Sequence, residues 1–201
     1  TRYRARIEIS ARPTDEVIAA CQRWLASLDP SSPSFERHQL EALWIQVGHN
    51  RLNVELLDRV LASKDHRARA AATKVLCYQR DKVPDVIDRL RKLAVDDHPR
   101  VRLEAIRAAS FFNDARAISI VTSSSSQSTD RFIDYTRGET LKALEPLVRK
   151  ALVEGISIDS VSDDAIRVML RGVNTSDLLQ AKRNRFVYEE LLMRRGVAEE
   201  V

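Results

Sequence analysis

The side chains that could bind a metal or carry out acid–base chemistry are few, and their spacing does not favour a site. The four histidines are His38, His49, His66 and His98. No two of them are three or four residues apart, the spacing that places two metal ligands on one face of a helix. His66 and His98 occupy equivalent positions of two similar segments described below. That repetition favours a structural role, because an active site rarely needs the same residue in each layer.

Nucleophiles and paired carboxylates lead to the same conclusion. The sequence contains no Gly-x-Ser-x-Gly elbow and no phosphate-binding glycine loop, and neither cysteine is close to a histidine in the chain. Asp96 and Asp97 are adjacent, so their side chains would point apart at a helix start and suit stabilisation of its positive end. We therefore predict no catalytic residue, no cofactor-binding residue and no metal ligand in this chain.

The two cysteines, Cys21 and Cys77, each lie within an apolar helical pattern. Cysteine behaves as a small hydrophobic residue in protein cores, so we predict two buried thiols. A disulfide between them is the alternative. The pair therefore gives no information about the redox compartment.

The composition favours a helical core. Of the 201 residues, 44% are hydrophobic, which is enough to bury a core, and only five are glycine and six are proline. Aromatic residues make up 5%, which argues against a β-sandwich or barrel. Basic residues number 33 and acidic residues 29, spread along the chain, so the formal net charge of +4 is weak evidence for an anionic partner.

Helical periodicity divides the chain into helices and short breaks. The first helix is expected after Pro13, a second over about 35–47, and a third from Asn53. A flexible polar loop is expected at the serine-rich stretch 123–128. Toward the C-terminus we expect a long helix over about 134–153 with Pro146 as a kink, then shorter helices near 163–170, 176–181 and 186–195.

Two segments of the chain resemble each other. LASKDHRARAAATKVL begins at Leu61 and LAVDDHPRVRLEAIRAA begins at Leu93, with Pro99 as the one extra residue. Extending this register finds arginines spaced by 32, 33 and 35 residues, at Arg37, Arg69, Arg102 and Arg137. A period of this size, carried by two helices per unit, predicts an α-solenoid. The many alanines of these segments would let neighbouring helices approach closely.

Residues 97–102 (DHPRVR), followed by Glu104 and the alanines at 105, 108 and 109, resemble the start of the second helix in HEAT repeats. Residues 65–69 (DHRAR) are a weaker copy. The resemblance implies an all-α fold, a right-handed α-α superhelix of about four to five helix pairs. In HEAT proteins, aspartates and arginines of the inner helices commonly form a ladder between repeats. The resemblance would place this ladder on Asp65, Arg69, Asp97 and Arg102.

We divide the chain at residue 154. Residues 1–154 are expected to hold HEAT-like repeats, with units near 13–47, 53–79, 82–111 and 113–153. Residues 155–201 depart from the repeat period. They are expected to form an irregular C-terminal helical cap or the start of further repeats.

A more particular similarity extends over most of the chain. It rests on the strings TRYRARIEISARP, HQLEALWIQ, RARAAATKVLCYQRDKVPD, HPRVRLEAIRAASFF and FVYEELLMRRGV. They resemble the middle region of large secreted bacterial proteins of the planctomycete and verrucomicrobial group, described as membrane-bound dehydrogenase or PVC-type haem-binding proteins. In that family a dehydrogenase-like β-propeller precedes the HEAT segment and a c-type cytochrome follows it. The resemblance implies a periplasmic or secreted protein, although the sequence itself leaves the compartment open.

The haem of such proteins is not expected in this chain, because no Cys-x-x-Cys-His motif occurs in it. The chain begins at Thr1 without a starter methionine, a signal sequence or an apolar run long enough to span a bilayer. We therefore expect a fragment of a longer protein, with no cofactor of its own.

These observations favour a non-catalytic scaffold or interaction module whose partners are neighbouring domains of the same polypeptide. The register of the second helices gives a candidate interaction surface: Arg67, Lys74, Arg100, Glu104 and Arg107. Nucleic-acid binding by a basic concave face is the alternative, since the isoelectric point is about 9.3. Acidic residues among these basic ones argue against it. A third hypothesis is a contribution to the dehydrogenase site of the intact protein; a small-molecule ligand is not expected.

Overall fold

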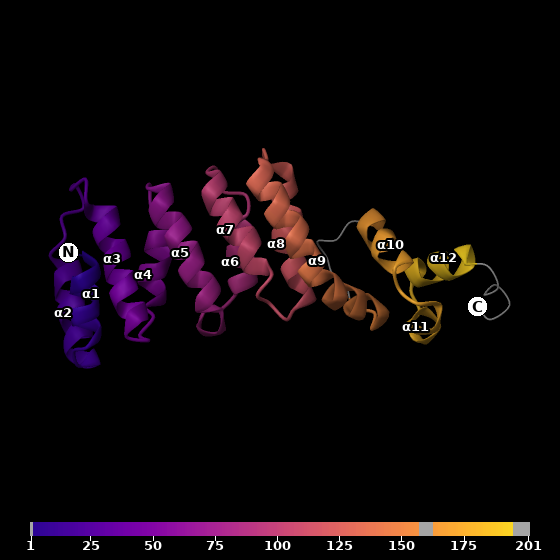
Figure 1. Cartoon of the computed structure of the whole chain (residues 1–201), viewed down its shortest axis with the longest axis horizontal. Coiled ribbons are helices and arrows are strands. Elements are labelled where there is room, and N and C mark those ends of the chain that lie inside the picture. The colour runs from indigo at the N-terminus through magenta and orange to yellow at the C-terminus, as the bar shows by residue number, and fades with distance from the viewer. Residues whose placement is uncertain (1, 157–162, 195–201) are drawn as a thin grey trace. The chain divides into compact units, whose positions relative to one another are not determined.

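The computed structural model describes residues 2–156 and 163–194, and every regular element in these residues is a helix (Figure 1). This confirms the predicted all-α solenoid. The chain divides into two compact units, residues 1–86 and 87–201, and each unit is described by itself.

The first unit is built from five α-helices and a short 3-10 turn. They are α1 (Arg2–Ser10), α2 (Thr14–Ala26), α3 (Phe35–Gly48), α4 (Val54–Leu61), α5 (His66–Tyr78) and η1 (Arg80–Lys82). Helix α3 packs against α2, α4 and α5, and α4 packs against α5. The core between them contains fully buried leucines, at Leu43, Leu56, Leu57 and Leu76. Burial of such side chains contributes roughly 2 kcal/mol each to folding.

Helix α1 was not predicted, because the sequence analysis expected the first helix only after Pro13. None of the described α1 side chains is buried, and polar contacts attach the helix to α3. The Arg6 guanidinium donates to Glu41 Oε2 at 2.6 Å and lies 4.4 Å from the centre of the Trp44 ring. His49 Nε2 lies 3.1 Å from the carbonyl oxygen of Ile9. A helix held in this way has no apolar stripe, which is the signal that periodicity detects.

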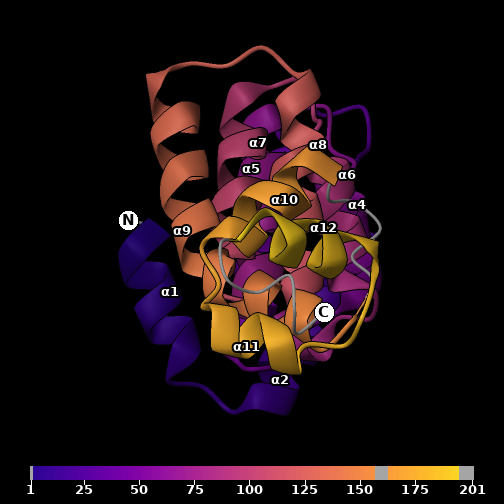
Figure 2. The ribbon, with the colours of Figure 1, turned by 90° about the vertical axis from the view of Figure 1, so that its right-hand side faces the viewer.

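The second unit contains the remaining helices. They are α6 (Val86–Leu93, whose first residue ends the first unit), α7 (Pro99–Ala109), η2 (Ala115–Ala117), α8 (Ile118–Ser123), η3 (Ser124–Ser126), α9 (Arg131–Val153), α10 (Asp163–Arg171), α11 (Thr175–Gln180) and α12 (Arg185–Met193). Helix α9 packs against α7, α8 and α10, while α12 packs against α10 and α11. The view in Figure 2 also shows α9 alongside α7.

Helix α7 contains completely buried alanines and packs against α9. Ala105 and Ala109 are completely buried, and the Thr140 hydroxyl donates to the carbonyl oxygen of Ile106 at 3.3 Å. An alanine surface lets two helix backbones approach closely, so a side-chain hydroxyl of one helix can reach the backbone of the next. The close helix packing that the sequence analysis expected of these alanines stays a prediction.

Both ends of α9 are defined by local hydrogen bonds. The Asp130 carboxylate accepts from the backbone N–H groups of Phe132 and Ile133, at 2.8 and 2.9 Å, so the helix begins three residues before the expected position 134. At the other end Gly155 has φ +70°, and the Ile156 N–H reaches back to the carbonyl oxygen of Ala151 at 2.8 Å. This is the Schellman closure that glycine permits.

The serine-rich stretch differs from the flexible loop expected there. Ser123 ends α8, and Ser124–Ser126 forms the 3-10 turn η3. The Ser124 side chain is buried, and its hydroxyl donates to the carbonyl oxygen of Val121 at 2.6 Å. Serine hydroxyls that bond to the preceding turn stabilise such an ending locally, an effect that composition does not reveal.

Candidate interaction surface

The five residues predicted to form an interaction surface lie on second helices of the repeats. Arg67 and Lys74 are exposed on α5 of the first unit. Arg100, Glu104 and Arg107 lie on α7 of the second unit, where Arg100 is exposed and the other two are half-buried. Within each helix the spacing of three, four or seven residues places them on one face.

On α7 the structure brings two of the predicted residues together. Arg107 donates from Nε to Glu104 Oε2 at 3.1 Å, and its Nη2 also lies 3.1 Å from that oxygen. The same guanidinium lies 5.3 Å from the centre of the Phe111 ring. Phe111 follows α7 by two residues and is 43% exposed. The α7 face therefore presents an acid, a base and an aromatic ring in that order along the helix.

Helix α9 carries an equivalent face, which the sequence analysis missed. The register that aligns Arg102 with Arg137 also aligns Arg100 with Tyr135, Glu104 with Glu139 and Arg107 with Lys142. Lys142 Nζ donates to Glu139 Oε1 at 2.8 Å, and this hydrogen bond is the main reason why the pKa of Lys142 is raised. The acid–base pair of α7 thus recurs three residues apart on α9.

These positions are here named the α7–α9 stripe, and its members are Arg100, Glu104, Arg107, Phe111, Tyr135, Glu139 and Lys142. The two helices run parallel, since Arg102 near the start of α7 contacts the residue Ser128 that precedes α9, and Ile106 contacts Thr140 further along. In the sequence register, the acids Glu104 and Glu139 occupy one equivalent position of the two helices, and the bases Arg107 and Lys142 occupy another.

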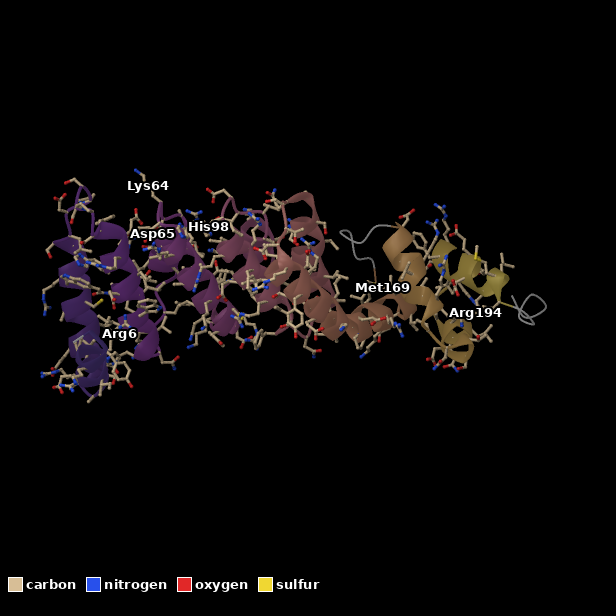
Figure 3. All side chains as sticks on the ribbon, turned by 45° about the horizontal axis from the view of Figure 1, so that its top comes forward. Arg6, Lys64, Asp65, His98, Met169 and Arg194 are labelled. Carbon is tan, nitrogen blue, oxygen red and sulfur yellow. The ribbon has the colours of Figure 1, made fainter. Side chains whose placement is uncertain are left out.

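The predicted ladder residues Asp65 and Arg69 both act at the start of α5, and Figure 3 labels Asp65. The Asp65 carboxylate caps the helix by accepting from the Arg67 N–H at 2.8 Å. Arg69 Nη1 donates back to the carbonyl oxygens of Ser63 and Lys64, at 3.0 and 3.4 Å. The arginine thus fastens its helix to the turn that joins α4 to α5.

Arg102 makes the same contacts in the next repeat. Its Nη1 donates to the carbonyl oxygens of Asp96 and Asp97, at 2.8 and 3.0 Å, which are again six and five residues earlier in the chain. In addition, its Nη2 donates to the carbonyl oxygen of Ser128 at 2.8 Å. Arg102 is 3% exposed. A buried guanidinium therefore joins the turn before α7 to the turn before α9.

The other two periodic arginines also bind the preceding turn. Arg137 donates to the Ser124 carbonyl oxygen at 3.1 Å, and Arg37 donates to the Ser34 hydroxyl at 3.2 Å. Three of the four periodic arginines thus bind turn backbone, and Arg37 binds a side chain of the turn instead. An Asp–Arg ladder from Asp65 and Arg69 to Asp97 and Arg102 would connect the two units, and it stays a prediction.

Cysteines, clusters of acidic residues or histidines, and surface grooves are the other features of the chain that could bind a metal or a small molecule. Both cysteines are buried thiols, as predicted, and burial is the main cause that raises the pKa of Cys21. Within the described residues, no cluster of three or more His, Cys, Asp or Glu side chains could hold a metal ion. An open groove of about 650 Å³ lies among α1, α2 and α3, with Val17, Trp24 and Ile45 in its walls. None of the nine predicted residues lines it.

The C-terminal helices of the second unit contain a further arginine-centred contact. Arg194 follows α12 and donates to Glu190 Oε1, to the Thr175 hydroxyl and to the Leu170 carbonyl oxygen, at 3.1, 3.0 and 3.1 Å (Figure 3). It thereby ties together the ends of α10, α11 and α12. We assign it to stability of this region.

Comparison with known protein families agrees with this geometry. Residues 53–145 match the family model of HEAT repeats. The matched region runs from the cap of α4 into α9 and so contains the α7–α9 stripe and the arginines 69, 102 and 137. No curated protein and no solved structure matches the chain. Among the described residues, no helix is both long and apolar enough to cross a membrane.

Proposed function

We propose that the chain is a non-catalytic protein-interaction module, and that the exposed faces of its second helices are the docking surface. The observation that supports this most directly is the HEAT-repeat match over the region that contains the α7–α9 stripe. HEAT-type stacks bury one side of each helix pair and present side chains of successive repeats as one surface. The paired charges and exposed rings of the stripe suit recognition of another protein.

The rigidity of α7 supports this assignment. Arg102 of α7 binds the turn before α9, and Thr140 of α9 binds the backbone of α7. The stripe is therefore carried by packed helices. A surface held in this way loses little conformational entropy when a partner binds, which favours affinity.

We further propose, from the sequence resemblance described above, that the chain is part of a larger secreted bacterial redox protein. In such a protein it would hold a dehydrogenase-like propeller and a c-type cytochrome in place, and its partners would be those neighbouring domains. The haem and the redox chemistry would belong to them.

Nucleic acid is the weaker alternative. Glu104 and Glu139 each pair with a base of the stripe, and carboxylates at these positions would repel a phosphate backbone. A protein that neutralised several phosphates would bind duplex DNA with an affinity that falls steeply as salt increases. Binding of this kind would contradict our proposal.

Photo-crosslinking tests the docking surface. A photoreactive residue at position 100, on the stripe, is compared with one at position 92. Lys92 is exposed and lies on α6, the helix that precedes α7. We expect one dominant crosslinked partner from position 100 and not from position 92, whereas equal labelling would reject the surface.

An immunoblot of fractionated source cells tests whether the chain is part of a larger redox protein. We expect a large, haem-staining band outside the cytoplasm. A small, haem-free cytoplasmic band would reject the proposal that the chain belongs to a larger secreted redox protein.

A further inference from the structure

An open apolar groove lies among the first three helices of the first unit. Helices α1 and α2 both pack against α3, whereas in the described residues α1 and α2 are not closely packed on each other. A groove of about 650 Å³ remains, and Val17, Trp24 and Ile45 supply apolar walls. Apolar surface that is open to water in this way favours contact with another apolar surface.

One face of α2 borders this groove and carries a charge at each end. Its members, here called the α2 face, are Glu16, Ala19, Ala20 and Arg23. The spacing of three, four and seven residues places them on one side of the helix. Seven residues of helix separate the acid from the base by about 10 Å along the axis. Both charged side chains are exposed, so both can be reached by a partner.

The two charges of the α2 face are unpaired. Within the described part of the chain, neither Glu16 nor Arg23 takes part in a side-chain hydrogen bond or an ion pair. Arg12, the other charged residue of the groove, already pairs with Glu8 at 3.0 Å. An acid in the first turn and a base in the last turn suit the helix dipole. The dipole accounts for the order of the two charges, but not for their position on one face beside an apolar groove.

The α2 face is complementary to itself. Two copies can pack their α2 helices antiparallel about a two-fold axis that passes between Ala19 and Ala20. Position 16 of each copy then meets position 23 of the other, so the interface contains two identical ion pairs. Alanines at the axis let the two helix backbones approach closely. A parallel arrangement would instead oppose acid to acid and base to base.

We propose that the α2 face and its groove form an interface between two copies of this chain. The α2 helix of the second copy covers the apolar walls, and the reciprocal pairs of Glu16 with Arg23 set the antiparallel direction. Because the contact involves few elements, the dimer is weak and concentration-dependent. This inference goes beyond the proposed function, since it concerns the first unit and does not depend on the α7–α9 stripe.

Sedimentation equilibrium of the full 201-residue chain measures self-association. We expect a reversible monomer–dimer equilibrium between about 10 µM and 1 mM. Glu16→Arg and Arg23→Glu, each alone, replace two attractions by two repulsions and should weaken the dimer at least about fourfold. Glu55→Arg is the matched control, because Glu55 is an exposed acid in the first turn of α4 and does not line the groove. The control should leave the dimer unchanged.

A mixture of the two single variants tests the pairing itself. A Glu16→Arg copy carries two bases on its α2 face and an Arg23→Glu copy carries two acids, so together they restore both ion pairs. The equimolar mixture should therefore associate about as tightly as the unchanged chain, although each variant alone does not. The double variant, Glu16→Arg with Arg23→Glu, should recover the dimer for the same reason. A charge reversal that acted only on folding or on the helix dipole could not produce this recovery. Circular dichroism checks that each variant stays folded.

Three results would overturn the inference. The first is a chain that stays monomeric at about 1 mM. The second is a dimer that neither charge reversal weakens, because its contact would then lie elsewhere or in another orientation. The third is a mixture that associates no better than its components. The crosslinking experiment at position 100 tests the proposed function separately, so either proposal can fail while the other stands.

Discussion

Replacement of Arg102 by methionine should cost the second unit about 3 kcal/mol of unfolding free energy. The guanidinium makes three hydrogen bonds to backbone carbonyl oxygens, at 2.8, 3.0 and 2.8 Å. Hydrogen bonds from a charged donor contribute about 1.5–3 kcal/mol each. The turn that contains Asp96 and Asp97 is partly exposed, so water replaces some of this loss and we count about 1 kcal/mol per bond. Methionine keeps much of the aliphatic packing, which isolates the polar contribution.

Urea denaturation followed by circular dichroism measures this loss, and hydrogen exchange locates it in the turns before α7 and α9. The matched control is Arg37→Met, since Arg37 is exposed and donates to a single hydroxyl at 3.2 Å. The control should change stability by less than about 0.5 kcal/mol. Arg102→Lys should recover less than half of the loss, because one ammonium cannot reach both turns. If Arg102→Met lowers the unfolding free energy no more than Arg37→Met does, the stabilising role of the Arg102 hydrogen bonds is refuted.

Two further predictions concern helix ends and acid stability. Asp130→Ala removes the cap that accepts from two N–H groups, and it should lower the unfolding free energy by about 1 kcal/mol, with faster exchange in the first turn of α9. Glu189 has a pKa lowered from 4.5, first by its hydrogen bond from Arg185 and then by that from Arg167. Its stabilisation is therefore present above the unfolded pKa near 4.5 and lost as pH falls through the lower folded value. Denaturation from neutral to acidic pH should show a smaller acid loss for Glu189→Gln; an unchanged profile would contradict the assignment.

The solenoid could be predicted because its signal is spread over many residues. Periodic arginines and alanines mark the second helices, and these positions are buried or bind turns in the structure. Helix α1 was missed because its attachment uses one ion pair, one ring contact and one histidine. Such contacts join residues about 35 to 40 positions apart, and no local pattern in the sequence encodes that pairing.

The candidate surface was only partly predictable. Register alone identified Arg100, Glu104 and Arg107 on α7, since exposed positions follow directly from helical periodicity. The same register could have predicted the α9 half of the surface. Tyr135 stands where α7 has Arg100, however, so the two helices do not look alike at that position. The backbone contacts of Arg102 were not predictable from residue types, because a guanidinium is equally suited to a carboxylate and to a carbonyl oxygen.

Stability and recognition place different demands on the basic residues of this chain. Arg102 is buried and binds backbone, so its loss should unfold structure. Lys142 lies at the surface, in an exposed pair with Glu139 of a kind that contributes at most about 1 kcal/mol. A pair that adds so little to folding, yet recurs at the same position of two successive repeats, is better explained by what it contacts outside the chain. Lys142→Gln should therefore change partner binding while leaving the unfolding free energy almost unaltered. Arg102→Met should instead lower the unfolding free energy.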